Sequence, residues 1–236
     1  MKHCIRLKKV YPDLISGYDT VGHEDSGRTL HSLTPELLWF RETCKAENVN
    51  IPFFFHAGEC LGDGDETDQN LFDAVLFGTR RIGHGFSLYK HPTLIDHVKE
   101  KSILIESCPI SNEVLRYTAS IMSHPLPALL ARGVAAALAN DDPALLGQGT
   151  SGMTHDFWQA LQGWENLGLE GLGSLAQNSV NWSAYEDESA EEWERSTKEG
   201  QKGAGIRAER VKEWNAEWEA FCEWIVAEFG DVLTSE

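Results

Sequence analysis

IPFFFHAGE, residues 51–59, decides the fold, because an apolar run of strand length ends in a histidine and, after a short turn, a glutamate. The same pattern of an apolar run followed by polar residues recurs in RRIGHGF (80–86), ILIESCPISN (103–112) and VAAALANDDP (134–143). Helical patterns separate these runs. Short apolar strands that alternate with helices predict βα units and a parallel sheet.

Five short strands are predicted, most of them followed by Gly, Pro or acidic residues that end a strand. They cover residues 15–21, 51–56, 81–84, 103–107 and 134–140. The helical patterns cover residues 34–48, 68–77, 92–101 and 126–132. This alternation suits both an open doubly wound sheet and a (β/α) barrel, and periodicity does not distinguish them. No GxGxxG motif follows a strand, so a dinucleotide is not favoured as ligand.

The carboxy-terminal part of the chain, from about Met153, has helical patterns only. The run EDESAEEWERSTKE (186–199) is strongly acidic, which predicts a solvated face. Six apolar residues then recur at helical spacing and predict one amphipathic helix; they are Val211, Trp214, Trp218, Phe221, Ile225 and Phe229. We expect this helix to pack against the main body, and a homodimer contact is the alternative.

Charge and composition exclude several classes of partner. The 236 residues carry 20 Lys+Arg against 37 Asp+Glu, and the formal net charge of −17 disfavours nucleic acid and acidic membrane surfaces. No apolar run reaches the roughly 18 residues of a membrane helix, and the start MKHCIRLKKVYPDL lacks the apolar stretch of a signal peptide. The five cysteines are widely spaced and form no CxxC pair, which argues against a zinc knuckle and a disulfide framework.

Ionisable residues gather where the predicted strands end. His56 and Glu59 follow one strand, His84 ends the next, and Asp141 and Asp142 follow the last. A single strand-end histidine is commonly structural, and two Asp before a proline commonly form a turn. Because the carboxyl ends of parallel strands share one face, we expect these five side chains to converge. His and Asp are suitable zinc ligands, and a second His with a carboxylic acid can move protons, so the set predicts metal-dependent hydrolysis.

Four ordered motifs resemble the adenosine deaminase family of zinc amidohydrolase barrels: HAGE (56–59), RIGHG (81–85), CPISN (108–112) and NDDP (140–143). GYDTVGHEDSG (17–27) looks like the strand and substrate loop that precede them in the family. The wording GDGDETDQNLFDAVLFGTRRIGHGF (62–86) is similar to the secreted subgroup, the adenosine deaminase-related growth factors. The resemblance runs from about residue 10 to residue 182 and implies an α/β fold of the metal-dependent hydrolase type, a (β/α)8 TIM barrel. It divides the chain into residues 1–182, the carboxy-terminal part of such a barrel, and an acidic, Trp-rich helical tail, residues 183–236.

The resemblance also implies residue roles. His56 and Asp141 would ligate Zn²⁺, and Glu59 would protonate the purine ring nitrogen. His84 would orient or deprotonate the attacking water, and Asp142 would bind that water and the purine. Gly22 would lie in the substrate loop.

The implied reaction is the hydrolytic deamination of adenosine or 2'-deoxyadenosine to inosine and ammonia. The partner is thus a small purine nucleoside rather than nucleic acid or membrane, and the subgroup implies an extracellular location. His31, His91, His97 and His124 lie in loops or at helix starts and are expected to be solvated.

One departure from the family pattern affects the expected activity. The family takes two further zinc ligands from an HxH pair, and no HxH occurs in these 236 residues. The five predicted strands resemble the fourth to eighth of the family, so we expect an incomplete, amino-terminally truncated barrel with a helical carboxy-terminal extension. With His56 and Asp141 as its only ligands, zinc should bind weakly, and we expect the chain alone to be nearly inactive. A non-catalytic remnant or interaction protein of the same fold is the alternative.

Overall fold

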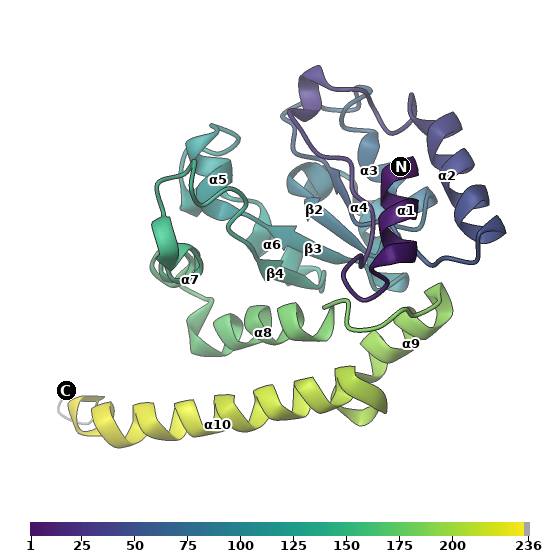
Figure 1. Ribbon diagram of the computed structural model, residues 1–236. Coiled ribbons are helices and arrows are strands. Elements are labelled where there is room, and N and C mark those ends of the chain that lie inside the picture. The colour runs from purple at the N-terminus through teal and green to yellow at the C-terminus, as the bar shows by residue number, and fades with distance from the viewer. Residues whose placement is uncertain (234–236) are drawn as a thin grey trace.

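The computed structural model describes residues 1–233, with side chains to residue 230, and contains one parallel sheet (Figure 1). The strands are β1 (Phe55–Ala57), β2 (Arg81–His84), β3 (Leu104–Ser107) and β4 (Ala136–Leu138), in the order β1-β2-β3-β4. In register, Phe55 pairs with Ile82, Ile82 with Ile105, and Ile105 with Ala136. The prediction of α/β architecture with parallel strands is confirmed.

Helices connect the strands and extend the chain beyond them. They are α1 (Lys2–Val10), α2 (Thr34–Ala46), α3 (Asn70–Leu76), α4 (Pro92–Glu100), α5 (Pro109–Val114), α6 (Leu126–Ala131), α7 (Gly152–Gly163), α8 (Gly168–Asn181), α9 (Ala190–Glu199) and α10 (Gly205–Leu233), with short 3-10 turns at Glu24–Ser26, Phe86–Lys90, Ile121–Ser123, Gly149–Ser151 and Gly200–Lys202. The helices predicted between the strands are confirmed to within two residues at each end. Pro35 and Pro92 lie in first turns, where the missing N–H costs nothing.

The predicted strand at residues 15–21 is wrong, since only a single bridge joins Tyr18 to Phe53. Tyr18 N–H donates to the Pro52 carbonyl and Phe54 N–H to the Tyr18 carbonyl, which starts a parallel ladder. The ladder stops because the next donor, the N–H of His56, bonds to the side chain of Asp19 instead. A carboxylate has therefore replaced the backbone partner that a longer strand would need.

The core lies between the sheet and the helices that cover it. Phe55, Ile82 and Ile105 point from adjacent strands into this layer and are fully buried. Helix side chains complete it, namely Leu37 and Phe40 of α2, Val98 of α4 and Leu129 of α6. Each such side chain contributes about 1.5–3 kcal/mol by leaving water, so this layer fixes the strands whose ends carry the polar residues.

The amphipathic helix α10 packs against α8, which lies between α10 and the sheet in Figure 1. Val211 is buried, and Trp218 lies so close to Gly173 of α8 that a Cβ there would come within 2.6 Å of the indole. Packing against the main body is thus confirmed for the first half of the helix. Phe221 and Trp224, further along, are 42% and 53% exposed. The homodimer alternative and the domain boundary after residue 182 stay predictions.

A side chain of α8 binds to the edge of the sheet that β4 forms. Ile105 N–H bonds to the Ala135 carbonyl, so the next carbonyl of the outermost strand, that of Ala136, points away from β3. The Asn178 amide nitrogen donates to this carbonyl at 2.8 Å. An outward-facing backbone group of β4 therefore has a partner from a helix rather than from a strand.

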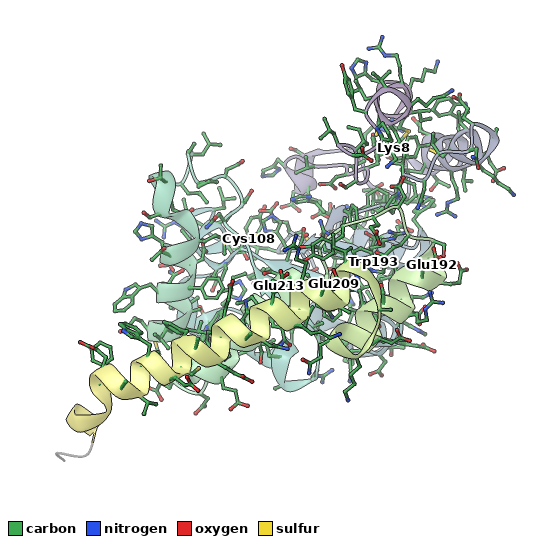
Figure 2. The ribbon with its side chains drawn as sticks, turned by 60° about the horizontal axis from the view of Figure 1, so that its bottom comes forward. Lys8, Cys108, Glu192, Trp193, Glu209 and Glu213 are labelled. Atoms are coloured by element: carbon green, nitrogen blue, oxygen red, sulfur yellow. The ribbon has the colours of Figure 1, made fainter. Side chains whose placement is uncertain are left out.

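Most charged residues of the acidic run 186–199 are exposed, as the predicted solvated face requires, but the run also contains the buried side chain of Trp193. Trp193 is 3% exposed, with the guanidinium carbons of Arg80 and Arg207 at 4.9 and 4.6 Å from its ring centroid. A capping box of Ser189 and Glu192 starts α9. In Figure 2, Trp193 and Glu192 lie on α9 beside the first part of α10. Both cations bind the indole face, and Arg80 connects this segment to the main body.

A buried lysine connects two segments that are far apart in the sequence. Lys8, at 3% exposure, donates to the Pro12 and Ile15 carbonyls and to Asp187, so it joins α1 to the segment before α9.

Within residues 1–233, no helix combines the length and the apolar character needed to span a bilayer.

Candidate active site and metal centre

Three ionisable side chains meet at the carboxyl ends of the strands. Glu59 lies in the turn after β1, His84 ends β2, and Asp141 follows β4. One ligand atom of each lies within 4.8 Å of the others. The His84 Nδ1 to Glu59 Oε1 distance is 3.6 Å, and the His84 Nε2 to Asp141 Oδ2 distance is 3.8 Å. The structure thus brings these three predicted site residues into one group that could hold a metal ion.

The backbone is left-handed at two members of this group. His84 has φ 62° and Asp141 has φ 64°, a region that non-glycine residues seldom adopt. His84 is held by the sheet and by Gly85, whose N–H donates to the Ala57 carbonyl. The Ser111 hydroxyl donates to Asp141 Oδ2 at 2.6 Å. Such conformations persist only where the surroundings enforce them, and they are typical of functional sites.

His56 lies beside this group but outside it. Its ring centroid is 5.3 Å from that of His84. Asp19 accepts from His56 twice, at Nδ1 (2.7 Å) and at the backbone N–H (3.0 Å). The ring crosses β2 at Gly83, where a Cβ would come within 2.8 Å of it. With Nδ1 held by a carboxylate, Nε2 is the nitrogen left for a ligand.

Asp19 is a residue that sequence reasoning missed. It lies within the GYDTVG stretch, and no spacing rule connects it to a histidine 37 positions later. The zinc role of His56 stays a prediction, because the group that could hold a metal consists of Glu59, His84 and Asp141.

The two predicted substrate residues lie in different surroundings. Gly22 lines a pocket of about 500 Å³ together with Asp19, Glu24 and His56, so it is close to one predicted metal ligand. Asp142 is exposed at the start of the turn after Asp141, and its carbonyl accepts from the N–H of Leu145. Their roles toward a substrate stay predictions.

Burial sets the protonation of the two central groups. It raises the pKa of Glu59 to about 7, and the negative charge of Asp141 acts in the same direction. It lowers the pKa of His84 to about 3, and the positive charge of His56 acts in the same direction. For His56, burial disfavours the charge, but the hydrogen bond and charge of Asp19 raise its pKa overall. Near neutral pH the site therefore pairs a carboxyl that can carry a proton with a neutral imidazole.

Glu24 supports the turn that carries Glu59, and sequence reasoning did not single it out. Its two carboxylate oxygens accept from the backbone N–H groups of Gly58 (3.0 Å) and Glu59 (2.7 Å). The Asn70 amide donates to it at 2.8 Å. Burial raises the pKa of Glu24, and these three donors oppose that rise. The carboxylate thus holds the HAGE turn from the opposite loop.

Replacing Glu24 with Ala is expected to lower the free energy of unfolding by about 1–3 kcal/mol, because two backbone N–H groups lose their acceptors. The measurement is a urea midpoint by circular dichroism. Asp25→Ala, at the exposed neighbouring position, is the control and should leave the midpoint in place. Equal midpoints for the two variants would show that water replaces the Glu24 contacts.

A third missed residue joins the loops after β3 and β4. Asp156 of α7 is fully buried and accepts from Asn140 Nδ2 (2.6 Å), Gln148 Nε2 (3.2 Å) and the Ile110 N–H (3.4 Å). Asn140 directly precedes Asp141, and Ile110 directly precedes Ser111. The carboxylate therefore fixes the two segments whose side chains meet at Asp141.

The expectation that His91 and His124 are solvated is wrong. His91 Nε2 lies 2.9 Å from the carboxylate of Asp68, which is itself fully buried. His124 is 7% exposed, and burial lowers its pKa to about 4, with His84 as the second cause. Hydrogen-bond partners that come from other loops permit this burial, and local sequence does not reveal them.

The contribution of His124 to the free energy of unfolding should therefore decrease as pH falls from 6.5 toward 4. Unfolded, His124 has its ordinary pKa of about 6.5, so in this window the unfolded chain binds the extra proton. The stabilisation is present above pH 6.5 and lost toward pH 4, and the shift to about 4 corresponds to on the order of 3 kcal/mol. Urea titrations at several pH values measure it. His124→Gln should show a shallower pH dependence than the unchanged chain, and identical slopes would contradict the assignment.

Comparisons with known proteins were made on sequence and on fold. The model of the family described as Adenosine deaminase matches residues 5–197. The chain is 39% identical over 188 residues to "Adenosine deaminase 2-A" of Danio rerio, covering 79% of this chain and 36% of that protein. It is 36% identical over 228 residues to "Adenosine deaminase" of Phlebotomus duboscqi, covering 97% and 40%. The chain thus spans less than half the length of these relatives.

Solved structures show the same fold at low identity. An amidohydrolase from Burkholderia ambifaria, solved with bound Zn, superposes with a TM-score of 0.61 and 18% identity, covering 93% of this chain and 56% of that one. An Arabidopsis protein complexed with IMP superposes with a TM-score of 0.60 and 18% identity, covering 84% and 54%. The sheet and its helices therefore match part of an amidohydrolase fold.

Proposed function

This chain belongs to the adenosine deaminase family, and from that premise we propose that its site carries the acid–base part of a zinc-dependent deaminase. The substrate class is a purine nucleoside, adenosine or 2'-deoxyadenosine, and the products are inosine and ammonia. The observation that carries the proposal is the meeting of Glu59, His84 and Asp141 within 4.8 Å at the strand ends. Water replaces the amino group of the purine, so the reaction needs a proton donor at the ring and an oriented water.

The donor set suits zinc. Carboxylate oxygen and imidazole nitrogen are ligands that zinc takes in proteins, and His56 keeps Nε2 free because Asp19 holds Nδ1. We propose that His56 and Asp141 would hold the ion. When bound, zinc would supply a Lewis acid that makes water more acidic.

The chain's own residues supply the remaining steps. Glu59, whose carboxyl is nearly buried, would donate a proton to the purine ring nitrogen. His84 and Asp142 would orient the water, and Gly22 would contact the substrate from the pocket that it shares with His56. Asn70 and the backbone of the HAGE turn hold Glu24, which keeps Glu59 at its place.

Further parts of the proposal concern the complete molecule. We propose that the sheet is part of a (β/α)8 barrel, as the partial superposition on an amidohydrolase supports. An extracellular location is proposed from the motif resemblance, and the fraction of tagged protein recovered from culture medium tests it. The alternative, an interaction protein of the same fold, draws support from the exposed Trp224 and Phe221 on α10.

The proposal is tested on two proteins. One is the 236-residue chain, and the other joins this chain to the part of the Phlebotomus duboscqi relative that precedes its matched segment. Each is loaded with zinc, its zinc content is measured, and adenosine conversion is followed by absorbance. We expect conversion by the joined protein in proportion to bound zinc, and no rate above background for the chain alone. A joined protein that folds and binds zinc but leaves adenosine unchanged would support the interaction protein instead.

A further inference from the structure

Three buried side chains form a line from the start of α6 to the candidate site. They are His124, Asn112 and His84, which are 7%, 1% and 3% exposed. Each touches the next through a ring nitrogen or an amide atom. Because water does not reach these atoms, every hydrogen bond in the line must pair one donor with one acceptor.

The line begins at a group whose role is fixed. The backbone N–H of Leu126 lies 3.1 Å from His124 Nδ1, and a backbone N–H can only donate. His124 Nδ1 is therefore the acceptor and carries no proton. A neutral imidazole has one proton, so His124 carries it on Nε2.

The proton on His124 orients the amide of Asn112. His124 Nε2 lies 3.0 Å from Asn112 Oδ1, which accepts this N–H. The reversed amide would place an NH₂ group against an N–H, two donors facing each other. Asn112 Nδ2 consequently points the other way, to His84 Nδ1 at 3.2 Å. This amide donates, so His84 Nδ1 accepts.

We propose that Asn112 and His124 are positioning residues that fix His84 in the tautomer with its proton on Nε2. This nitrogen faces the site, with Asp141 Oδ2 at 3.8 Å. Glu59 is the other group near Nδ1, but its Oε1 at 3.6 Å lies beyond hydrogen-bond distance. Burial lowers the pKa of His124, which agrees with a neutral ring at the start of the line.

The tautomer decides what His84 does in the reaction, a consequence that rests on the proposed function. An Nε2 that already carries a proton donates a hydrogen bond to the water oxygen and does not take the proton of that water. When the water O–H bond breaks, the proton must pass to a carboxylate oxygen, and the candidates are Asp141 and Asp142. His84 thus orients the attacking water, and the carboxylate of Asp141 or Asp142 acts as the base.

The test is ¹⁵N NMR of the metal-free 236-residue chain labelled at histidine, where long-range proton–nitrogen correlations distinguish protonated from unprotonated ring nitrogens. His84 signals are assigned by their loss in His84→Gln. We expect a protonated Nε2 and an unprotonated Nδ1 for both His84 and His124. A proton on His84 Nδ1 overturns the proposal. The spectrum needs no turnover, so a failed deamination assay and a failed tautomer assignment are separate results.

A variant tests whether Asn112 imposes the tautomer. In Asn112→Asp both side-chain oxygens accept, so His84 is expected to move its proton to Nδ1 while His124 keeps its proton on Nε2. Asn48→Asp, at an exposed position, is the control and should leave both rings unchanged. A folded Asn112→Asp chain whose His84 still carries its proton on Nε2 overturns the role of Asn112.

If Asn112→Asp does not fold, the spectrum of His124→Gln decides instead. The amide that this substitution introduces can still donate to Asn112 Oδ1, so the His84 tautomer should be preserved. Loss of that tautomer in a folded His124→Gln chain overturns the relay.

Discussion

Glu59→Gln is expected to lower kcat for adenosine by about 10²–10⁴-fold in the joined, zinc-loaded protein, with little change in KM. Glutamine has the same shape and still forms hydrogen bonds, but it has no acidic proton to give to the purine ring. The carboxyl of Glu59 is suited to this role, since burial and Asp141 raise its pKa to about 7. Initial rates over a range of adenosine concentrations separate kcat from KM.

The control and the zinc content decide how this loss is interpreted. Glu66→Gln, in the exposed loop after the HAGE turn, should leave the rate unchanged. If Glu59→Gln also loses zinc, Glu59 is a ligand, as its grouping with His84 and Asp141 allows, and the proton donor must be sought elsewhere. A variant that retains both zinc and rate would contradict the assignment of Glu59 as acid.

Arg207→Met is expected to lower the free energy of unfolding by about 3–5 kcal/mol, the cost of leaving a buried charge without its partner. Arg207 is 3% exposed and pairs with Glu188, which is 15% exposed. The same guanidinium donates to the Asn181 and Ser183 carbonyls and to the Ser196 hydroxyl, and it lies over Trp193. Methionine keeps most of the stem but none of these donors. Urea unfolding followed by circular dichroism measures the loss.

A second arginine on the same helix provides the matched control. Arg210 pairs with Glu213 in the solvent-exposed i,i+3 arrangement, and Arg210→Met should leave the unfolding midpoint in place. Equal midpoints for the two variants would mean that the contacts of Arg207 add nothing beyond those of a surface pair. A loss confined to Arg207→Met would show that this buried pair holds the start of α10 against the segment before α9.

The sequence predicts four strands because their apolar runs are local and continuous. It predicts the meeting of Glu59, His84 and Asp141 because parallel strands bring their carboxyl ends to one edge. The strand at 15–21 could not be excluded in this way, since the Asp19 side chain that ends its ladder acts across 37 positions. Periodicity describes neighbours along the chain and carries no information on such pairs.

The supporting residues were missed for the same physical reason. Glu24 holds the HAGE turn across 34 positions and Asp156 holds Ile110 across 46. Glu24 lies in the stretch that resembles a substrate loop and Asp156 lies among helical patterns, so neither position indicates a buried structural carboxylate. The burial of Trp193 cannot be predicted from its acidic neighbours, because two distant cations decide it. Buried polar partners are tertiary facts that appear only once the chain is folded.

The amide of Asn178 donates to the outward carbonyl of Ala136, where the N–H of a further strand would otherwise bind. A further strand that pairs with β4 must displace that amide, so one hydrogen bond replaces another of similar strength. The exchange is close to neutral in hydrogen-bond energy, so shape and apolar contact would govern whether the sheet grows at this edge. While the amide is bound, the edge strand has one fewer unpaired backbone group with which another copy of the chain could pair.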